Sequence, residues 1–312
     1  MKRTVFENPR LAILIAIFCN LLWATPLPMI KIGYQLFAIG ESVSSKLLFA
    51  GIRFFSSGVL LLVYHRLSSR TWATVHRQNY LLVLILALVQ TTGQYFFAYL
   101  GVAHTTGAAA TIFSSVSACY AVVLAHFFFK DDKLTVQKVV GSLVCVFGIF
   151  ISTLGEGTIR FSFNGEGFLL LSQLCFAFGS IFSKKITRTD GPLAVTAINL
   201  TLGGLLLILI GLGGGGSLPV VSLSGILVLA YLVFVSAMAF TLWSQLLKYN
   251  PVGKISVFTF IIPIAGTLFS ALVLGEDIMH VKYPISLALV TAGIYAIYWK
   301  QKKVARTSQL PS

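Results

Sequence analysis

The chain has 312 residues, of which 57% are hydrophobic and only 10% are charged, and its mean hydropathy is +0.90. Soluble domains carry about 25% charged residues, so the composition excludes an ordinary soluble protein and predicts an all-α integral membrane protein. The net charge of +14 would suggest a nucleic-acid partner in a soluble chain. In a membrane protein, the positions of the basic residues decide whether this charge reflects the topology or a nucleic-acid partner.

Long apolar segments recur along the whole chain, separated by short loops. A helix needs about 20 apolar residues to cross the hydrocarbon core. The first apolar segment follows a basic start, but it contains Pro26 and Pro28 and has no clear cleavage site, so we expect it to be retained as a span. We predict ten transmembrane helices, at residues 11–31, 44–64, 79–99, 105–128, 134–153, 165–183, 192–212, 221–246, 252–274 and 281–299.

The basic residues predict one orientation in the membrane. With the N-terminus inside, 18 of the 23 lysines and arginines fall in inner segments, four fall outside, and Arg53 lies within a span. Cytoplasmic loops are generally enriched in lysine and arginine. We therefore predict a multi-pass protein of the inner or plasma membrane with both termini cytoplasmic. This topology explains the excess charge, so no nucleic-acid partner is expected.

The two halves of the sequence repeat each other weakly. At an offset of 146 residues, Gly107 falls on Gly253 and Arg53 on Asn199; at an offset of 153, Trp23 falls on Phe176. Because each half holds five spans, an odd number, the second half must enter the membrane in the opposite orientation. Inverted repeats with broken helices at their interface are a transporter plan, with the solute near the midplane. We predict two units, at residues 9–155 and 164–300.

The apolar stretch at 250–277 carries a proline, Pro263, in the middle of a span. Proline removes one backbone donor and frees the carbonyl four residues earlier, on Thr259. In lipid that carbonyl has to be satisfied by protein or by water in a cavity. We therefore expect this helix to have one face that does not contact lipid.

Several of these features resemble the EamA-type branch of the drug/metabolite transporter superfamily, over nearly the whole chain. The resemblance is carried by Leu22-Trp23-Ala24 followed by Lys31, by Arg53, by Lys248 to Pro251, and by Pro263 with Leu274-Gly275-Glu276. In the first unit, Ser117 stands where the pattern has proline and Lys130 where it has glutamate. The resemblance implies a basket of ten helices in two inverted five-helix repeats and transport of small metabolites.

The expected activity is therefore export or facilitated passage of amino acids or similar polar solutes, with sugars or nucleosides as an alternative within transporters. Two other classes remain open: a membrane-embedded lipid-modifying enzyme and a non-transporting sensor. The sequence has no Walker A, HExxH or GxSxG pattern and no metal-ligand spacing, so we expect no enzyme activity, cofactor or metal. The expected partners are the solute and membrane lipid, with a homodimer through the fifth and tenth spans.

Polar residues inside spans are costly in lipid and usually face the bundle interior. In the third span Gln90 and Gln94 are four residues apart, so we expect them on one helix face. Interhelical hydrogen bonding is the structural alternative for all these residues, and Trp243 also suits the membrane interface. The candidate solute-binding residues are Asn20, Trp23, Thr25, Gln90, Gln94, Tyr95, Ser117, Tyr120, Gln173, Trp243, Thr259 and Pro263.

Arg53 is the one permanently charged residue well inside a predicted span. It is either an anchor for an anionic group or a partner of backbone carbonyls on a neighbouring helix. No aspartate or glutamate falls in a predicted mid-span, whereas proton-coupled carriers usually need a titratable group in the membrane. We therefore expect transport driven by the gradient of the solute itself.

Overall fold

The computed structural model describes residues 5–104, 113, 116–152, 162–274 and 281–299, and these residues form helices and connecting segments without a β-strand. Six helices are long and apolar enough to cross a membrane, and four shorter apolar helices accompany them. The six are Pro9–Leu36, Val43–Ser69, Arg77–Val102, Phe163–Thr187, Pro192–Gly213 and Leu223–Tyr249; the four are Val116–Phe128, Val136–Ile151, Val252–Gly266 and Pro284–Ile297. The predicted all-α membrane class is confirmed. Of the predicted span 105–128, residues 105–112 and 114–115 lie outside the described residues.

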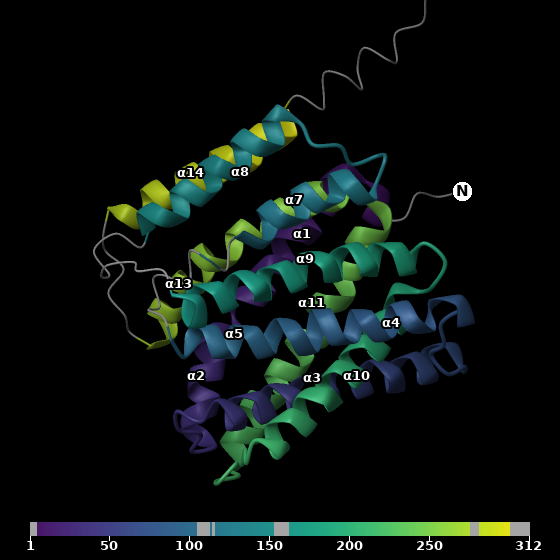
Figure 1. Ribbon diagram of the computed structural model, residues 1–312, viewed down its shortest axis with the longest axis vertical. Coiled ribbons are helices and arrows are strands. Elements are labelled where there is room, and N and C mark those ends of the chain that lie inside the picture. Colours follow the sequence, from purple (N-terminus) through teal and green to yellow (C-terminus); the bar gives the residue numbers. More distant parts are fainter. Residues whose placement is uncertain (1–4, 105–112, 114–115, 153–161, 275–280, 300–312) are drawn as a thin grey trace, which may run out of the picture.

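The described α-helices, except the short α12, are labelled in Figure 1. They are α1 (Pro9–Ala24), α2 (Pro26–Leu36), α3 (Val43–Ser69), α4 (Tyr80–Leu86), α5 (Gln94–Val102), α7 (Val116–Phe128), α8 (Val136–Ser152), α9 (Phe168–Thr187), α10 (Pro192–Gly213), α11 (Leu223–Tyr249), α12 (Val252–Ser256), α13 (Ile261–Leu274) and α14 (Lys282–Trp299). Short 3-10 turns at Val5–Glu7 and Arg77–Asn79 precede α1 and α4.

Four long helical stretches depart from regular α-helix, and three do so in the interior of a predicted span. The first span breaks at Thr25, where α2 begins with Pro26 at its first position, because a proline cannot donate the backbone hydrogen bond that would continue α1. The third contains a π-helical segment, Ala87–Gly93, between α4 and α5. The ninth tightens to a 3-10 helix at Val257–Phe260, directly before α13 and its Pro263. A further π-helical turn, Phe163–Gly167, opens α9.

Glycines let α3 and α10 pack with their backbones in close approach. A Cβ on Gly58 would lie 2.4 Å from the backbone nitrogen of Thr201, and one on Gly204 would lie 2.2 Å from that of Phe55. Small residues at such interfaces allow the van der Waals packing that holds membrane helices together. Gly58 lies beside Thr201 while Gly51 lies beside Ile208, so the two helices run antiparallel.

A second antiparallel pair, α8 with α14, crosses the opposite side of the bundle in Figure 1. Gly141 and Gly293 face each other there, each in contact with the backbone carbonyl of the other. Helices α1, α7, α9 and α11 lie between the two pairs (Figure 1). A buried apolar cluster joins α1, α7, α9 and α11 to α12 and α13 and to the outer pair. The interior of the bundle lies between these central helices.

Candidate functional site

A cavity of about 210 Å³ lies in the interior of the bundle. It is bordered by residues of α1, α2, α3, α5, α7, α9, α11 and α13 and of the 3-10 segment 257–260. The lining residues are Trp23, Pro26, Ile30, Arg53, Gln94, Tyr95, Ser117, Gln173, Phe176, Phe240, Thr259, Ile262 and Pro263. Helical irregularities supply much of the lining, because the α1–α2 break, the start of α5 and the start of α13 all reach it.

Arg53 is the charged residue of the cavity wall. Its side chain is 3% exposed, and its Nε donates a hydrogen bond of 2.7 Å to Ser236 Oγ on α11. The guanidinium group also lies 4.9 Å from the ring of Phe54. Among the described residues its two terminal nitrogens have no hydrogen-bond or ion-pair partner.

Gln94 and Gln173 add uncharged polar groups to the wall. The Oε1 atom of Gln94 is buried and accepts no hydrogen bond from any residue that the structure describes. An unsatisfied buried acceptor costs about 1–3 kcal/mol, so a donor from a bound solute or a water would stabilise it. Among the described lining residues none is acidic. The cavity therefore offers one positive charge, amide groups and hydroxyls.

Aromatic rings form the apolar part of the wall. The ring of Trp23 lies 5.7 Å from that of Phe176 and 5.3 Å from that of Phe240, both edge to face. Behind them, Trp243 lies 5.1 Å from Trp23 and donates its indole N–H to Ser180 Oγ. Tyr95 packs against Phe54 on the other side. These contacts come from α1, α3, α5, α9 and α11, so the rings tie the central helices together around the cavity.

The structure brings eight of the candidate residues together around this cavity: Trp23, Arg53, Gln94, Tyr95, Ser117, Gln173, Thr259 and Pro263. The other candidates lie outside its lining. Asn20 is fully buried and donates to the Ala16 carbonyl; Thr25 donates to the Leu22 carbonyl and accepts from Tyr231. Trp243 packs behind Trp23, and Tyr120 packs against the apolar cluster.

Gln90 and Gln94, which their spacing predicts to share a helix face, have different surroundings in the structure. Gln90 accepts a hydrogen bond from Asn199 of α10, whereas Gln94 lines the cavity. Gln90 lies within the π-helical segment Ala87–Gly93 and Gln94 directly after it, and such a segment changes the helical phase of the residues that follow it.

Five lining residues were not among the candidates: Pro26, Ile30, Phe176, Phe240 and Ile262. The internal repeat holds a signal for two of them. Phe176 follows Trp23 by 153 residues, and Phe240 follows Gln94 by 146 residues. Ser117 and Pro263, also 146 residues apart, both line the cavity as well. Positions that correspond at these offsets thus line the same cavity.

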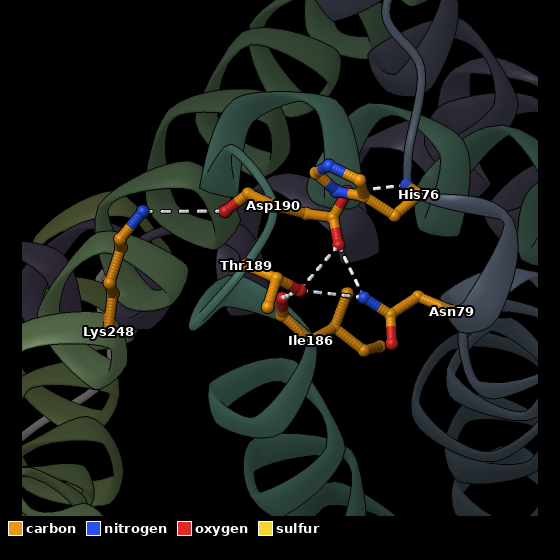
Figure 2. A network of polar contacts seen from close by, with 6 residues as sticks. All are labelled: His76, Asn79, Ile186, Thr189, Asp190 and Lys248. Carbon is orange, nitrogen blue, oxygen red and sulfur yellow. Dashed lines mark hydrogen bonds and ion pairs between the residues drawn. The ribbon is translucent and has the colours of Figure 1, made fainter.

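Two buried carboxylates link the helix ends at the N-terminal face, which we define as the end of the bundle where α1 begins. Asp132, after α7, accepts hydrogen bonds from the Lys138 ammonium and from Gly253 N–H of α12. Asp190, between α9 and α10, accepts from His76 N–H at 2.7 Å and from the Asn79 amide. Figure 2 shows the Asp190 side chain meeting His76, Asn79 and Thr189, while Lys248 reaches its backbone carbonyl.

The hydrogen-bond donors around Asp190 favour the ionised form of its carboxyl group. Burial on its own would raise the pKa of Asp190, but hydrogen bonds from the His76 backbone, the Asn79 amide, the His76 ring and the Thr189 hydroxyl outweigh it. The pKa of Asp190 is therefore held below its ordinary value of 3.8. Because His76 and Asn79 precede α4 while Asp190 precedes α10, the carboxylate joins the first half of the chain to the second.

A larger cleft of about 500 Å³ lies between α1, α13 and α14. Its lining is apolar apart from Thr291 and Tyr295. Such a surface suits the acyl chain of a lipid, and it offers no group that would select a polar solute. The smaller polar cavity is therefore the candidate solute site.

Comparison with known proteins identifies the family. The EamA-like transporter family matches the chain twice, at residues 10–154 and 163–299. The chain belongs to this family. The two matches are tandem units, and the family is one of membrane transporters within the drug/metabolite transporter superfamily.

Relatives of this EamA-family chain carry transporter names. It is 25% identical over 265 residues to the Bacillus subtilis "Uncharacterized transporter YetK", covering 81% of this chain and 78% of that protein. It is 26% identical over 274 residues to the Escherichia coli K12 "Uncharacterized inner membrane transporter YedA", covering 84% of this chain and 87% of that protein. The chain is thus a multi-pass membrane transporter.

A solved crystal structure shares the fold, with a TM-score of 0.77 and 18% identity, covering 91% of this chain and 96% of the other. At this identity the likeness concerns the fold alone. The EamA-family assignment and the shared fold cover the helices that surround the cavity.

Proposed function

We propose that this EamA-family protein is an inner-membrane exporter or facilitator of small polar metabolites, such as amino acids, and that the cavity at Arg53 and Gln94 is its solute site. One observation carries the proposal. The cavity combines a buried charge, an unpartnered buried amide oxygen and an aromatic wall, and both sequence halves contribute to it. Solute sites of secondary transporters lie near the midplane, at the interface between such repeats.

The two halves, at residues 9–155 and 164–300, are arranged as inverted five-helix repeats in this proposal. The antiparallel course of α3 and α10 supports it, because these helices hold corresponding positions of the two halves. Two hydrogen bonds support it further. Arg53 donates to Ser236, and Asn199 donates to Gln90. Asn199 lies 146 residues after Arg53, and Gln90 lies 146 residues before Ser236. A single two-fold relation accounts for both pairs.

Alternating access follows from this arrangement as rocking of one half against the other. The N-terminal face is the cytoplasmic side, since the basic residues accumulate in its loops. In the conformation described here, Asp132 and Asp190 each bond a segment of the opposite half at that face. Opening to the cytoplasm requires both sets of hydrogen bonds to break. The 3-10 segment 257–260 before Pro263 is the position where the ninth helix would bend.

The gradient of the solute itself drives transport in this proposal. No acidic side chain lines the described cavity wall, and a carboxylate relay usually needs such a group within the membrane. In proteoliposomes we expect flux to continue when the pH gradient alone is dissipated. Collapse of flux under that condition would reject this part of the proposal.

Comparison of wild type with two glutamine variants tests the proposed site. Gln94→Ala removes the cavity amide, whereas Gln78→Ala removes an exposed amide from the segment before α4. Each protein is overproduced in a bacterial host, and small solutes are quantified in cells and medium by mass spectrometry. We expect wild type and Gln78→Ala to lower the cellular level of a solute and raise its level in the medium, and Gln94→Ala to do so less. Equal export by Gln94→Ala at equal membrane levels would refute the assignment.

A further inference from the structure

Arg53 carries a charge that the surrounding protein does not neutralise. It lies in the interior of α3 at 3% exposure. Ser236 satisfies Nε, and no described carboxylate lies within ion-pair distance of the guanidinium group. Removing one partner of a buried ion pair is strongly destabilising because the other charge stays uncompensated. A charge kept in this state suggests that its counter-ion arrives with a ligand.

In the second half of the chain, the residue that corresponds to Arg53 only joins neighbouring helices. Asn199 corresponds to Arg53 at the 146-residue offset, and it is neutral. Its Nδ2 donates to Gln90 Oε1, and its Oδ1 accepts from the Thr91 hydroxyl. A small neutral amide therefore suffices to join α10 to its neighbour. The charge and the free terminal nitrogens of Arg53 exceed that structural need, and Arg53, unlike Asn199, lines the cavity.

The cavity also limits the charge and shape of what Arg53 can bind. A guanidinium group matches a carboxylate through two parallel hydrogen bonds. Because Arg53 is the sole cation among the described lining residues, it balances one negative charge. Gln94 Oε1 requires an N–H or O–H donor, and Trp23, Phe176 and Phe240 offer an apolar surface.

We propose that the solute is a small organic monoanion: a carboxylate that binds Arg53, a neighbouring hydroxyl group that donates to Gln94, and an apolar body that packs on Trp23, Phe176 and Phe240. This inference rests on the proposed solute site and names the class of solute it takes. Inorganic phosphate lacks the apolar body, and organic cations place a like charge beside Arg53, so both are excluded.

Equilibrium binding to the purified full-length protein tests this class without requiring transport. The probes are 3-phenyllactate, its neutral amide, the cation phenylalaninol and inorganic phosphate, titrated in detergent micelles by calorimetry. We expect 3-phenyllactate to bind at least about tenfold more tightly than any other probe, since it alone combines a carboxylate for Arg53 with an apolar body. Binding of the amide or of phosphate with the affinity of the carboxylate would overturn the proposal.

Variants of two arginines on the same helix locate the effect. Arg53→Gln should remove the preference for carboxylate over amide, and Arg53→Lys should retain part of it because the charge stays. Arg66→Gln, an exposed position on α3, should bind like wild type. Equal loss in Arg66→Gln and Arg53→Gln would contradict the role of Arg53. If Arg53→Gln does not fold, the preference of Arg53→Lys for carboxylate over amide and the wild-type affinities for the four probes test the proposal.

The outcome separates this inference from the proposed function. Solute export through the cavity without any selectivity for carboxylates would reject the monoanion and leave the carrier standing. Selective, Arg53-dependent binding of 3-phenyllactate without solute export would support the monoanion site and contradict the carrier.

Discussion

At the scale of single residues, Asp190 gathers hydrogen bonds from more separate segments than its loop position suggests. His76 and Asn79 come from the segment before α4, and Thr189 from its own loop, while Lys248 binds its backbone carbonyl from α11 (Figure 2). These bonds favour the carboxylate over the carboxylic acid. Ionised Asp190 therefore stabilises the contacts between these segments at the N-terminal face.

We predict that Asp190→Asn lowers stability at pH 7 by about 1–3 kcal/mol, the usual loss for hydrogen bonds to a charged group. Because the pKa of Asp190 is lowered by folding, its contribution is present above its ordinary value of 3.8 and is lost as the pH falls through the lower folded value. Melting curves of the purified protein from pH 7 to pH 3 should show a smaller acid-induced loss in Asp190→Asn than in wild type.

The exposed neighbour of Asp132 provides the control for that measurement. Asp131→Asn removes the same charge from an exposed side chain and should follow the wild-type pH profile. A profile of Asp190→Asn that coincides with wild type would show that the carboxylate contributes nothing to closure.

Residue types in the sequence identified the polar members of the cavity better than its aromatic members. Gln94, Gln173 and Arg53 are conspicuous because polar groups are rare within apolar spans. Phe176 and Phe240 are not, since an aromatic ring in a span is equally suited to lipid, to the core or to a cavity. Hydropathy does not tell these environments apart; helix packing does.

At the scale of single elements, irregular helices decide which side chains reach the cavity. The sequence predicted that Pro263 would disturb the ninth span, and the structure forms a 3-10 helix at 257–260 before it. The break of the first span at Thr25, before Pro26, was not predicted. The π-helical segment 87–93 contains no proline and had no sequence signal. Gln94, directly after it, lines the cavity, whereas Gln90, within it, bonds Asn199.

Close helix packing gives a second prediction. Gly204→Ala places a methyl group 2.2 Å from the Phe55 backbone nitrogen, and a backbone cannot move aside as a flexible side chain can. We expect a loss of about 1–3 kcal/mol from overpacking, measured as a lower melting temperature.

Gly213→Ala is the matched control, because a Cβ at that position of the same helix meets nothing within 4 Å. It should leave the melting temperature unchanged or raise it slightly, since alanine favours helix over glycine. Similar losses in both variants would mean that the α3–α10 contact is not the source of the effect.

At the scale of the whole molecule, ten apolar segments and a weak internal repeat predicted the class of fold from the sequence, and the family match agrees with it. The location of the cavity did not follow from hydropathy. It depends on which positions of the two halves meet, such as Trp23 with Phe176, and that pairing is a property of packing. In the proposed transport cycle, the lining residues that correspond at the repeat offsets belong to two inverted halves.

The central claim is that this cavity opens alternately to the two sides of the membrane. Cysteine labelling tests it directly, with Cys19, Cys119, Cys145 and Cys175 replaced by alanine and Ser117→Cys introduced in the cavity wall. A membrane-impermeant thiol reagent is applied to the outer side of intact cells and to the inner side of inverted vesicles from an active variant. The proposal predicts labelling from each side and slower labelling when transported solute is present. Labelling confined to one side, with a rate unaffected by solute, would contradict it.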